Sequence, residues 1–263
     1  MRNHVSYSEI KTWNECAYKH KLVYIDNVKK FLGNEYTAFG TAVHDVCEKV
    51  VLKEIKNSKE ELQNSFNKKF LEEIKDLLSK KVVLDKNLIK QMRTQAEHLV
   101  EHILPELNNY FSNYEVFSAE EELYETIDNH DKKYKGYIDL VLKTSDGKYH
   151  IIDWKTCSWG WDSRRKNDSI TTYQLTFYKY FFSKKHNIDI KDIETHFSLL
   201  KRTAKKNKVE FFRVTSGNKK IENSLKLLNK AVYNIDKSNF VKNKLSCTSG
   251  YGCEFYNTKF CSR

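Results

Sequence analysis

The chain has 263 residues, of which 40% are hydrophobic, so it can bury a substantial core in one large domain or two small ones. Mean hydropathy is low, at −0.70, and no apolar run approaches the about 20 residues of a membrane-spanning helix. We therefore expect a soluble, intracellular protein with no membrane partner. The net charge is +11, and residues 179–244 alone hold 17 Lys or Arg against 6 Asp or Glu. This excess indicates either a polyanionic partner or a solvated, lysine-rich surface.

The first 115 residues are predicted to be helical. Ser6 and Glu9 have the spacing of a capping box, which predicts a helix from there to about Tyr24. Three more segments carry helical patterns, and Pro105 marks a kink or break in the last of them. These three segments are 36–56, 59–80 and 86–114.

After Glu115 the pattern changes to strands. Three β-rich segments separated by polar turns predict a meander, and a helix, two strands and a final helix follow. The predicted strands are 116–127, 134–143, 149–156, 195–202 and 209–214, and the predicted helices are 170–185 and 219–237. We expect a single α/β domain over residues 1–263, with a helical part at 1–115, an α/β core at 116–245 and a cysteine-rich tail at 246–263.

Two acidic residues interrupt strands that otherwise have a buried pattern. Asp139 lies in one strand, and Asp153 and Lys155 lie in the next, joined to it by a short turn. Side chains two apart on a strand share a face, so Asp153 and Lys155 are predicted to project together toward Asp139. The Asp and Lys of an isolated D-x-K motif are usually ordinary residues on a solvated strand face. Here the apolar neighbours on both strands indicate that the charges are buried, and buried charges need partners or a metal.

Such a site suits phosphodiester hydrolysis. Carboxylate oxygens hold Mg²⁺, and the metal polarises a phosphate while lowering the pKa of its bound water. Lys155 is then expected to orient that water or to stabilise the developing charge.

The sequence resembles the RecB-like branch of the PD-(D/E)XK nucleases, which includes the nuclease domains of RecB and AddB and a CRISPR-associated exonuclease family. The resemblance extends over nearly the whole chain and rests on five motifs in order: SYSEIKTWNEC, GTAVH, GYID, DWK and QLTFY. It implies a restriction-endonuclease-like core, a mixed β-sheet flanked by helices in α-β-β-β-α-β order. The helices and strands predicted above agree with that order.

The resemblance also implies roles for particular residues. His44, Asp139, Asp153 and the backbone carbonyl of Trp154 would be metal ligands for Mg²⁺ or Mn²⁺, and Lys155 would be catalytic. Gln174 and Tyr178, one helical turn apart, would face the substrate strand. On the preceding strand, where the family often has an acid, Glu121 and Glu122 are given only a supporting role.

The cysteines form a separate group. Part of the family closes its nuclease domain with a 4Fe-4S cluster held by one N-terminal and three C-terminal cysteines. This chain has the same distribution, in Cys16, Cys247, Cys253 and Cys261. The tail spacing, C-x5-C-x7-C, departs from the tighter spacing expected of the family, so zinc or unligated thiols remain alternatives. Cys47 and Cys157 are given no ligand role.

Two segments are candidates for DNA binding. The loop after DWKT interleaves aromatic and basic side chains, a composition that suits unstacked bases, although it equally suits an aromatic cluster that fixes the loop. These residues are Trp159, Trp161, Arg164 and Arg165. Lys201 and Arg202 begin a basic turn that is a second candidate for phosphate contact.

Together these patterns predict a Mg²⁺- or Mn²⁺-dependent DNA nuclease. We expect an exonuclease acting on single-stranded or frayed DNA ends in repair, recombination or phage DNA processing, in the cytoplasm of a bacterium or in a phage system. One alternative is a non-catalytic DNA-binding scaffold that partners a helicase or a recombinase. Another is an endonuclease, or an RNase, on the same fold.

Overall fold

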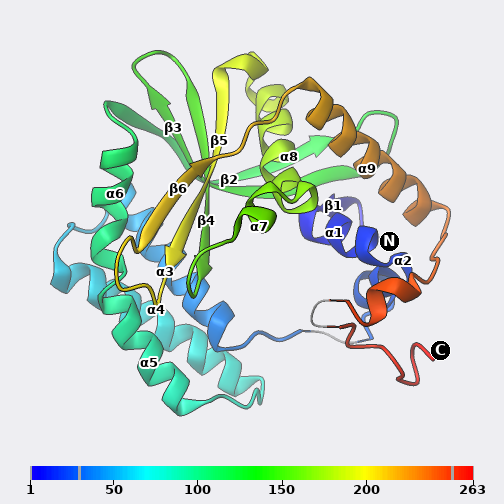
Figure 1. Ribbon diagram of the computed structural model, residues 1–263, viewed down its shortest axis with the longest axis horizontal. Helices are drawn as coiled ribbons and strands as arrows, with labels where there is room; N and C mark the ends of the chain where they lie inside the picture. Colours follow the sequence, from blue (N-terminus) through cyan, green and yellow to red (C-terminus); the bar gives the residue numbers. More distant parts are fainter. Residues whose placement is uncertain (1, 29–30, 250–251, 263) are drawn as a thin grey trace. The chain divides into compact units, whose positions relative to one another are not determined.

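The computed structural model describes residues 2–28, 31–249 and 252–262 (Figure 1). Contacts between Cα atoms divide the chain into two compact units. Unit 1 comprises Met1–Phe31, Glu122–Gly136 and Ser216–Arg263, and unit 2 comprises Leu32–Glu121 and Tyr137–Thr215. The single domain stays a prediction. Within the described ranges, no helix is long and apolar enough to cross a membrane.

The strands form a mixed sheet. Within the described residues it has six strands in the order β1-β3-β4-β5-β6, with β2 also paired to β3. The β1–β3 and β4–β5 pairs are parallel, whereas the β3–β4 and β5–β6 pairs are antiparallel. This confirms the restriction-endonuclease-like α/β fold class. The strands are β1 (His4–Ser6), β2 (Tyr114–Thr126), β3 (Lys133–Thr144), β4 (Tyr149–Cys157), β5 (Ile193–Lys201) and β6 (Val209–Arg213).

Unit 1 contains the terminal helices. Ser6 Oγ accepts a hydrogen bond from the Glu9 backbone N–H, as the capping box predicts, but the Glu9 carboxylate lies 2.8 Å from the Nε2 atom of buried His20. The predicted first helix is broken at Cys16, whose backbone is extended with φ −161°. The helical elements are α1 (Tyr7–Glu15), α2 (Ala17–His20), the π-helix η1 (Lys21–Ile25), α9 (Asn218–Asp236) and the 3-10 helix η4 (Lys244–Cys247).

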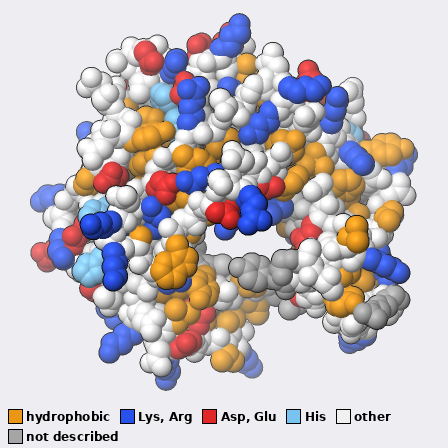
Figure 2. All heavy atoms as spheres, viewed as in Figure 1, with side chains coloured by type: hydrophobic (Ala, Val, Ile, Leu, Met, Phe, Trp, Pro, Cys, Tyr) orange, Lys and Arg blue, Asp and Glu red, His pale blue; other side chains and the backbone are white. Residues whose placement is uncertain are grey.

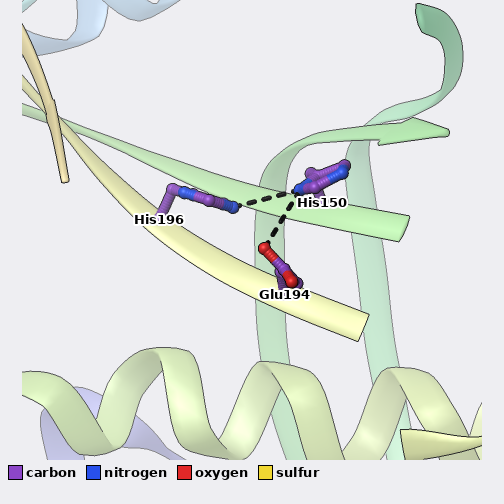
Figure 3. Close-up of side chains that lie close together, drawn as sticks. All are labelled: His150, Glu194 and His196. Atoms are coloured by element: carbon purple, nitrogen blue, oxygen red, sulfur yellow. Dashed lines mark hydrogen bonds and ion pairs between the residues drawn. The ribbon is translucent and has the colours of Figure 1, made fainter. Parts of the chain in front are cut away.

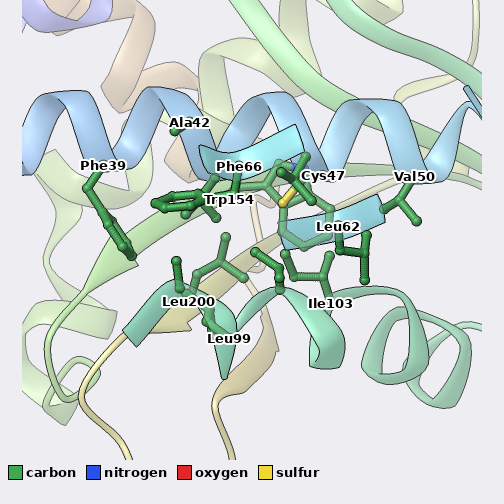
Figure 4. Packing of buried hydrophobic residues seen from close by; sticks show 14 of the residues in the cluster. Phe39, Ala42, Cys47, Val50, Leu62, Phe66, Leu99, Ile103, Trp154 and Leu200 are labelled. Atoms are coloured by element: carbon green, nitrogen blue, oxygen red, sulfur yellow. The ribbon is translucent and has the colours of Figure 1, made fainter. Parts of the chain in front are cut away.

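Helices of unit 2 and strands β3 and β4 enclose an apolar cluster, part of which Figure 4 shows. Phe39 from α3, Phe66 from α4 and Trp154 from β4 are almost fully buried there, and each such side chain stabilises the fold by about 2–3 kcal/mol. Pro105 lies in the first turn of α6, where its missing N–H costs little, so the helix breaks before it. These elements are α3 (Glu35–Val51), α4 (Lys59–Ser79), α5 (Lys86–Glu97), the 3-10 helix η2 (Val100–His102) and α6 (Ile103–Tyr110).

Helix α8 (Ser169–His186) contacts strands β4 and β5 (Figure 1). It begins at Asp168, whose side chain accepts a hydrogen bond from the Thr171 backbone N–H at 2.7 Å. The short helix α7 (Ser163–Asn167), not predicted from the sequence, precedes it, and the 3-10 turn η3 (Ile190–Asp192) leads into β5.

Candidate active site

Strand pairing brings the two aspartates together in unit 2. Leu140 on β3 pairs with Ile152 on β4, so Asp139 and Asp153 occupy the next position of each strand. Asp139 Oδ2 accepts a hydrogen bond of 2.6 Å from the backbone N–H of Trp154. The Asp139 carboxylate is thereby fixed against β4 at the position where the D-x-K motif begins.

Asp153 is a buried carboxylate, with only 2% of its surface exposed. Its Oδ1 atom accepts a hydrogen bond of 2.8 Å from Gln174, and Lys155 Nζ lies 2.7 Å from Oδ2. A carboxylate oxygen has two lone pairs, so Oδ2 keeps one for another ligand beside its contact with Lys155. Burial raises the pKa of Asp153 to about 6, although the Lys155 ammonium opposes this rise.

His44 reaches the same centre from α3. A Cβ atom on Gly40, one turn earlier, would lie 3.2 Å from Thr156 Oγ1, so the glycine allows α3 to approach β4 closely. His44 Nδ1 then lies 3.5 Å from Asp139 Oδ1. Burial is the largest single effect and lowers the pKa of His44, but the charge and hydrogen bond of Asp139, together with the charge of Asp153, raise that pKa above its usual value. The G-x-x-x-H spacing thus has a packing reason as well as a chemical one.

Glu120 on β2 joins this group and was missed by the sequence reasoning. Its φ of +47° lies in the left-handed region, which is strained for a residue other than glycine. Before Glu120 the less exposed positions of β2 are mostly even-numbered, whereas after it they are odd-numbered, as at a β-bulge. A carboxylate oxygen of Glu120 lies within 4.8 Å of ligand atoms of His44 and Asp139. Partial burial, with the charges of Asp139 and Glu48, raises the pKa of Glu120 to about 7.

The neighbouring acids lie elsewhere. Glu121 is paired with Lys185 at 2.8 Å and with His186. Glu122 is exposed and lies 3.1 Å from Lys135 in unit 1. The sequence contains three consecutive glutamates and therefore signals an acid on this strand, but only the bulge decides which of them faces the centre.

The centre fits a divalent cation. One ligand atom each from His44, Glu120 and Asp139 lie within 4.8 Å of one another, beside a cavity of about 450 Å³. Carboxylate oxygens with one imidazole suit Mg²⁺ or Mn²⁺. Asp153 is not part of this group of three, so its role as a metal ligand stays a prediction. The Trp154 side chain is buried in the core, and its backbone lies between the two aspartates.

Gln174 and Tyr178 both lie on the face of α8 that meets this centre. Gln174 Nε2 donates to Asp153 Oδ1 and to Tyr178 OH, the latter at 3.0 Å. Tyr178 is 5% exposed. In this arrangement the pair holds the Asp153 carboxylate in position, and contact with a substrate strand stays a prediction.

The candidate DNA-binding residues after DWKT differ in exposure. Trp159 is 78% exposed, whereas Trp161 is buried against Phe197, with the Arg165 guanidinium 4.4 Å from its ring centre. Arg164 is exposed on α7. Trp161 therefore belongs to an aromatic cluster that fixes the loop, which is one of the two alternatives from the sequence. Trp159, Arg164 and Arg165 are exposed to solvent.

The basic turn begins with two buried residues. Lys201 forms an ion pair of 2.9 Å with Glu210. Arg202 donates to Gln95 at 2.6 Å and lies over the ring of Tyr36. These contacts explain why both side chains are fixed, and a role in phosphate binding stays a prediction. Other Lys and Arg side chains spread over the face shown in Figure 2, with acidic side chains between them.

The four clustered cysteines all lie in unit 1. They line one cavity of about 420 Å³, and all are free thiols. The Asn243 backbone N–H donates to Cys16 Sγ at 3.3 Å, and the Cys253 N–H donates to the Cys247 carbonyl at 3.0 Å. Among the described residues, the sulfurs do not form a group of three within 4.8 Å, although a tetrahedral zinc site would place them about 3.8 Å apart.

A mixed sheet with Asp139 at a carboxylate-rich cavity, and with a buried Asp153–Lys155 ion pair on the adjacent strand, is typical of metal-dependent nucleases. The sequence model of the PD-(D/E)XK nuclease superfamily matches residues 4–257. The chain belongs to this superfamily.

A solved structure described as a "Putative exonuclease" from Eubacterium rectale is similar, with 12% identity and a TM-score of 0.54, over 89% of this chain and 79% of that one. At this identity the likeness shows a common fold alone. A second solved structure, named SSO0001, has 15% identity and a TM-score of 0.34, over 65% of this chain and 72% of that one. A search of curated proteins found no significant match.

Proposed function

We propose that this nuclease is a Mg²⁺- or Mn²⁺-dependent DNA exonuclease that hydrolyses phosphodiester bonds at single-stranded or frayed ends. The observation that carries the proposal is the buried Asp153 carboxylate, which lies between the Lys155 ammonium and Gln174 and keeps one lone pair free. Such a carboxylate is costly to bury, and a bound cation would offset that cost.

His44, Glu120, Asp139 and Asp153 would hold the metal, with the Trp154 carbonyl as a further ligand. A divalent cation here would polarise the phosphate and lower the pKa of a bound water. Lys155 would orient the attacking water and stabilise the negative charge that develops on the phosphate. The water oxygen forms a bond to phosphorus and gives up a proton, the ester P–O bond breaks, and the leaving oxygen takes a proton. Gln174 keeps Asp153 in place throughout.

The preference for DNA ends rests on the resemblance to the RecB-like branch, and the description of the Eubacterium rectale protein agrees with it. Exposed Trp159, with exposed Arg164 five residues further along the chain, could stack an unpaired base and contact the phosphate backbone. We infer that the enzyme acts in repair, recombination or phage DNA processing, together with a helicase or a recombinase that supplies unwound ends.

The test uses end-labelled single-stranded and double-stranded linear DNA, closed circular DNA and RNA, each in Mg²⁺, in Mn²⁺ and in EDTA. We expect metal-dependent loss of linear DNA, intact circles, and no cleavage by Asp153→Asn. The control is Glu222→Gln, which removes one negative charge at an exposed position on α9 and should cleave normally. Cleaved circles would indicate an endonuclease instead, and intact binding with no cleavage of any substrate would favour the DNA-binding scaffold.

We also propose that Cys16, Cys247, Cys253 and Cys261 hold a 4Fe-4S cluster. A cavity lined by all four thiols, and a backbone N–H directed at Cys16 Sγ, support this assignment. Cysteines that hold such a cluster must stay reduced rather than form disulfides, so we place the enzyme in the cytoplasm. Protein purified without oxygen should be brown and contain about four irons per chain. Cys47→Ala should keep the colour, and colourless protein with one zinc would contradict the cluster.

A further inference from the structure

Two histidines and a glutamate converge on the face of the sheet opposite to Asp153. Glu194 and His196 on β5 are two residues apart, and His150 on β4 pairs with Glu194 in the parallel register. His150 Nδ1 lies 3.1 Å from His196 Nε2 and 3.9 Å from Glu194 Oε2, as Figure 3 shows. All three ligand atoms lie within 4.8 Å of one another, and the whole group belongs to unit 2.

The other nitrogen of each imidazole has its own partner. His150 Nε2 lies 3.0 Å from Thr144 Oγ1, and His196 Nδ1 lies 3.3 Å from Tyr110 OH. If both outer nitrogens carry protons and donate to these hydroxyls, both inner nitrogens present lone pairs to the same point. Metal-bound histidines are typically oriented by such hydrogen bonds from the second ring nitrogen.

The surroundings favour neutral imidazoles. Both histidines are buried, with 8% and 2% of their surfaces exposed, and Phe111 packs against both rings at 5.0 Å. Burial lowers the pKa of His150, and it lowers the pKa of His196 to about 3.

The two carboxylate oxygens of Glu194 have different partners. Glu194 Oε1 is paired with Arg213 at 3.1 Å and Lys148 at 3.4 Å, whereas Oε2 is turned toward His150. The two cations hold the side chain in place and leave one oxygen for a ligand position. They also repel a divalent ion, so removing one of these two positive charges should strengthen metal binding.

We propose that His150 Nδ1, His196 Nε2 and Glu194 Oε2 bind a transition-metal ion of the zinc type, which joins β4 to β5 and is separate from the nuclease centre. Two imidazoles and one carboxylate are a ligand set suited to Zn²⁺, which takes nitrogen and oxygen ligands at about 2.0–2.2 Å with water in the remaining position. The ion has a structural role, because the three residues lie on the opposite face of β4 from Asp153 and Lys155.

The direct test is a crystal of the wild-type protein soaked in Zn²⁺, with anomalous diffraction measured on both sides of the zinc absorption edge. We expect a peak within about 2.2 Å of all three ligand atoms. Peaks only at the Asp139 carboxylate or at the cysteine sulfurs would show that the soak succeeded and would overturn the assignment.

Solution measurements on variants give a second test. Zn²⁺ affinity is measured by competition with a chromophoric chelator. His196→Gln should lose one equivalent of bound zinc, and Tyr110→Phe, which removes only a hydroxyl, should bind about tenfold more weakly at this site. Arg213 is 53% exposed, so Arg213→Gln should fold normally and bind zinc about threefold more tightly. Unchanged affinity in both Tyr110→Phe and Arg213→Gln would show that the histidines only form a hydrogen bond to each other.

Discussion

Replacing Asp153 by asparagine should stabilise the metal-free protein while abolishing cleavage. Burial raises the pKa of this carboxyl from 3.8 to about 6, and that difference corresponds to about 3 kcal/mol of destabilisation when Asp153 is charged. Asparagine keeps an oxygen that can accept the hydrogen bond from Gln174, but Lys155 loses its partner. We therefore expect the free energy of unfolding to rise by about 1–3 kcal/mol at pH 8.

The stability gained by Asp153→Asn should depend on pH. The folded state binds the Asp153 proton more tightly than the unfolded state does, so the destabilisation is absent below pH 3.8, grows up to about pH 6 and is constant above it. Urea unfolding of wild type and Asp153→Asn, both in EDTA, should show a gain at pH 8 that vanishes near pH 4. Glu222→Gln, at an exposed position, should change little at either pH. An equal or lower stability of Asp153→Asn at pH 8 would show that the buried Asp153 charge does not destabilise the fold.

Substitutions at Glu120, Gly40 and His196 should also have measurable effects. Glu120→Gln should weaken Mn²⁺ binding at least about tenfold in calorimetry, whereas Glu121→Gln should not, because only Glu120 faces the other ligands. Gly40→Ala gains about 1 kcal/mol of helix propensity but places its Cβ 3.2 Å from Thr156 Oγ1, so nuclease activity should fall while thermal stability stays nearly unchanged. His196 has a folded pKa near 3 against 6.5 when unfolded, so acidification from pH 7 to pH 5 in EDTA should cost wild type about 2 kcal/mol more than His196→Gln in urea unfolding.

Local sequence patterns predicted the two aspartates and the lysine of the candidate active site, but not the residues around them. The proximity of Asp139, Asp153 and Lys155 follows from the two-residue alternation of strands and from one short turn, and both can be read from sequence. Glu120 could not be identified, because a single left-handed residue shifts the alternation of β2 and leaves no mark in the sequence. Trp161 likewise has the composition of a base-stacking residue, but tertiary packing buries it.

Contacts between distant segments account for the other differences. The strand β1 is only three residues long, too short for a periodic signal, and it exists through its pairing with Lys133–Lys135. The group formed by His150, Glu194 and His196 depends on the parallel register of β4 and β5, which are separated by helix α8 in the chain. Nothing in the local sequence of either strand indicates that register, so the group became visible only in three dimensions.

Cleavage should require one divalent cation held by Asp139, Asp153 and their neighbours. The most direct measurement determines Mn²⁺ binding and linear-DNA cleavage on the same samples of wild type, Asp139→Asn and Asp153→Asn. Both variants should lose Mn²⁺ affinity and cleavage together, while a fold check by circular dichroism stays unchanged. Cleavage that persists in either variant, or that proceeds in EDTA, would contradict the account.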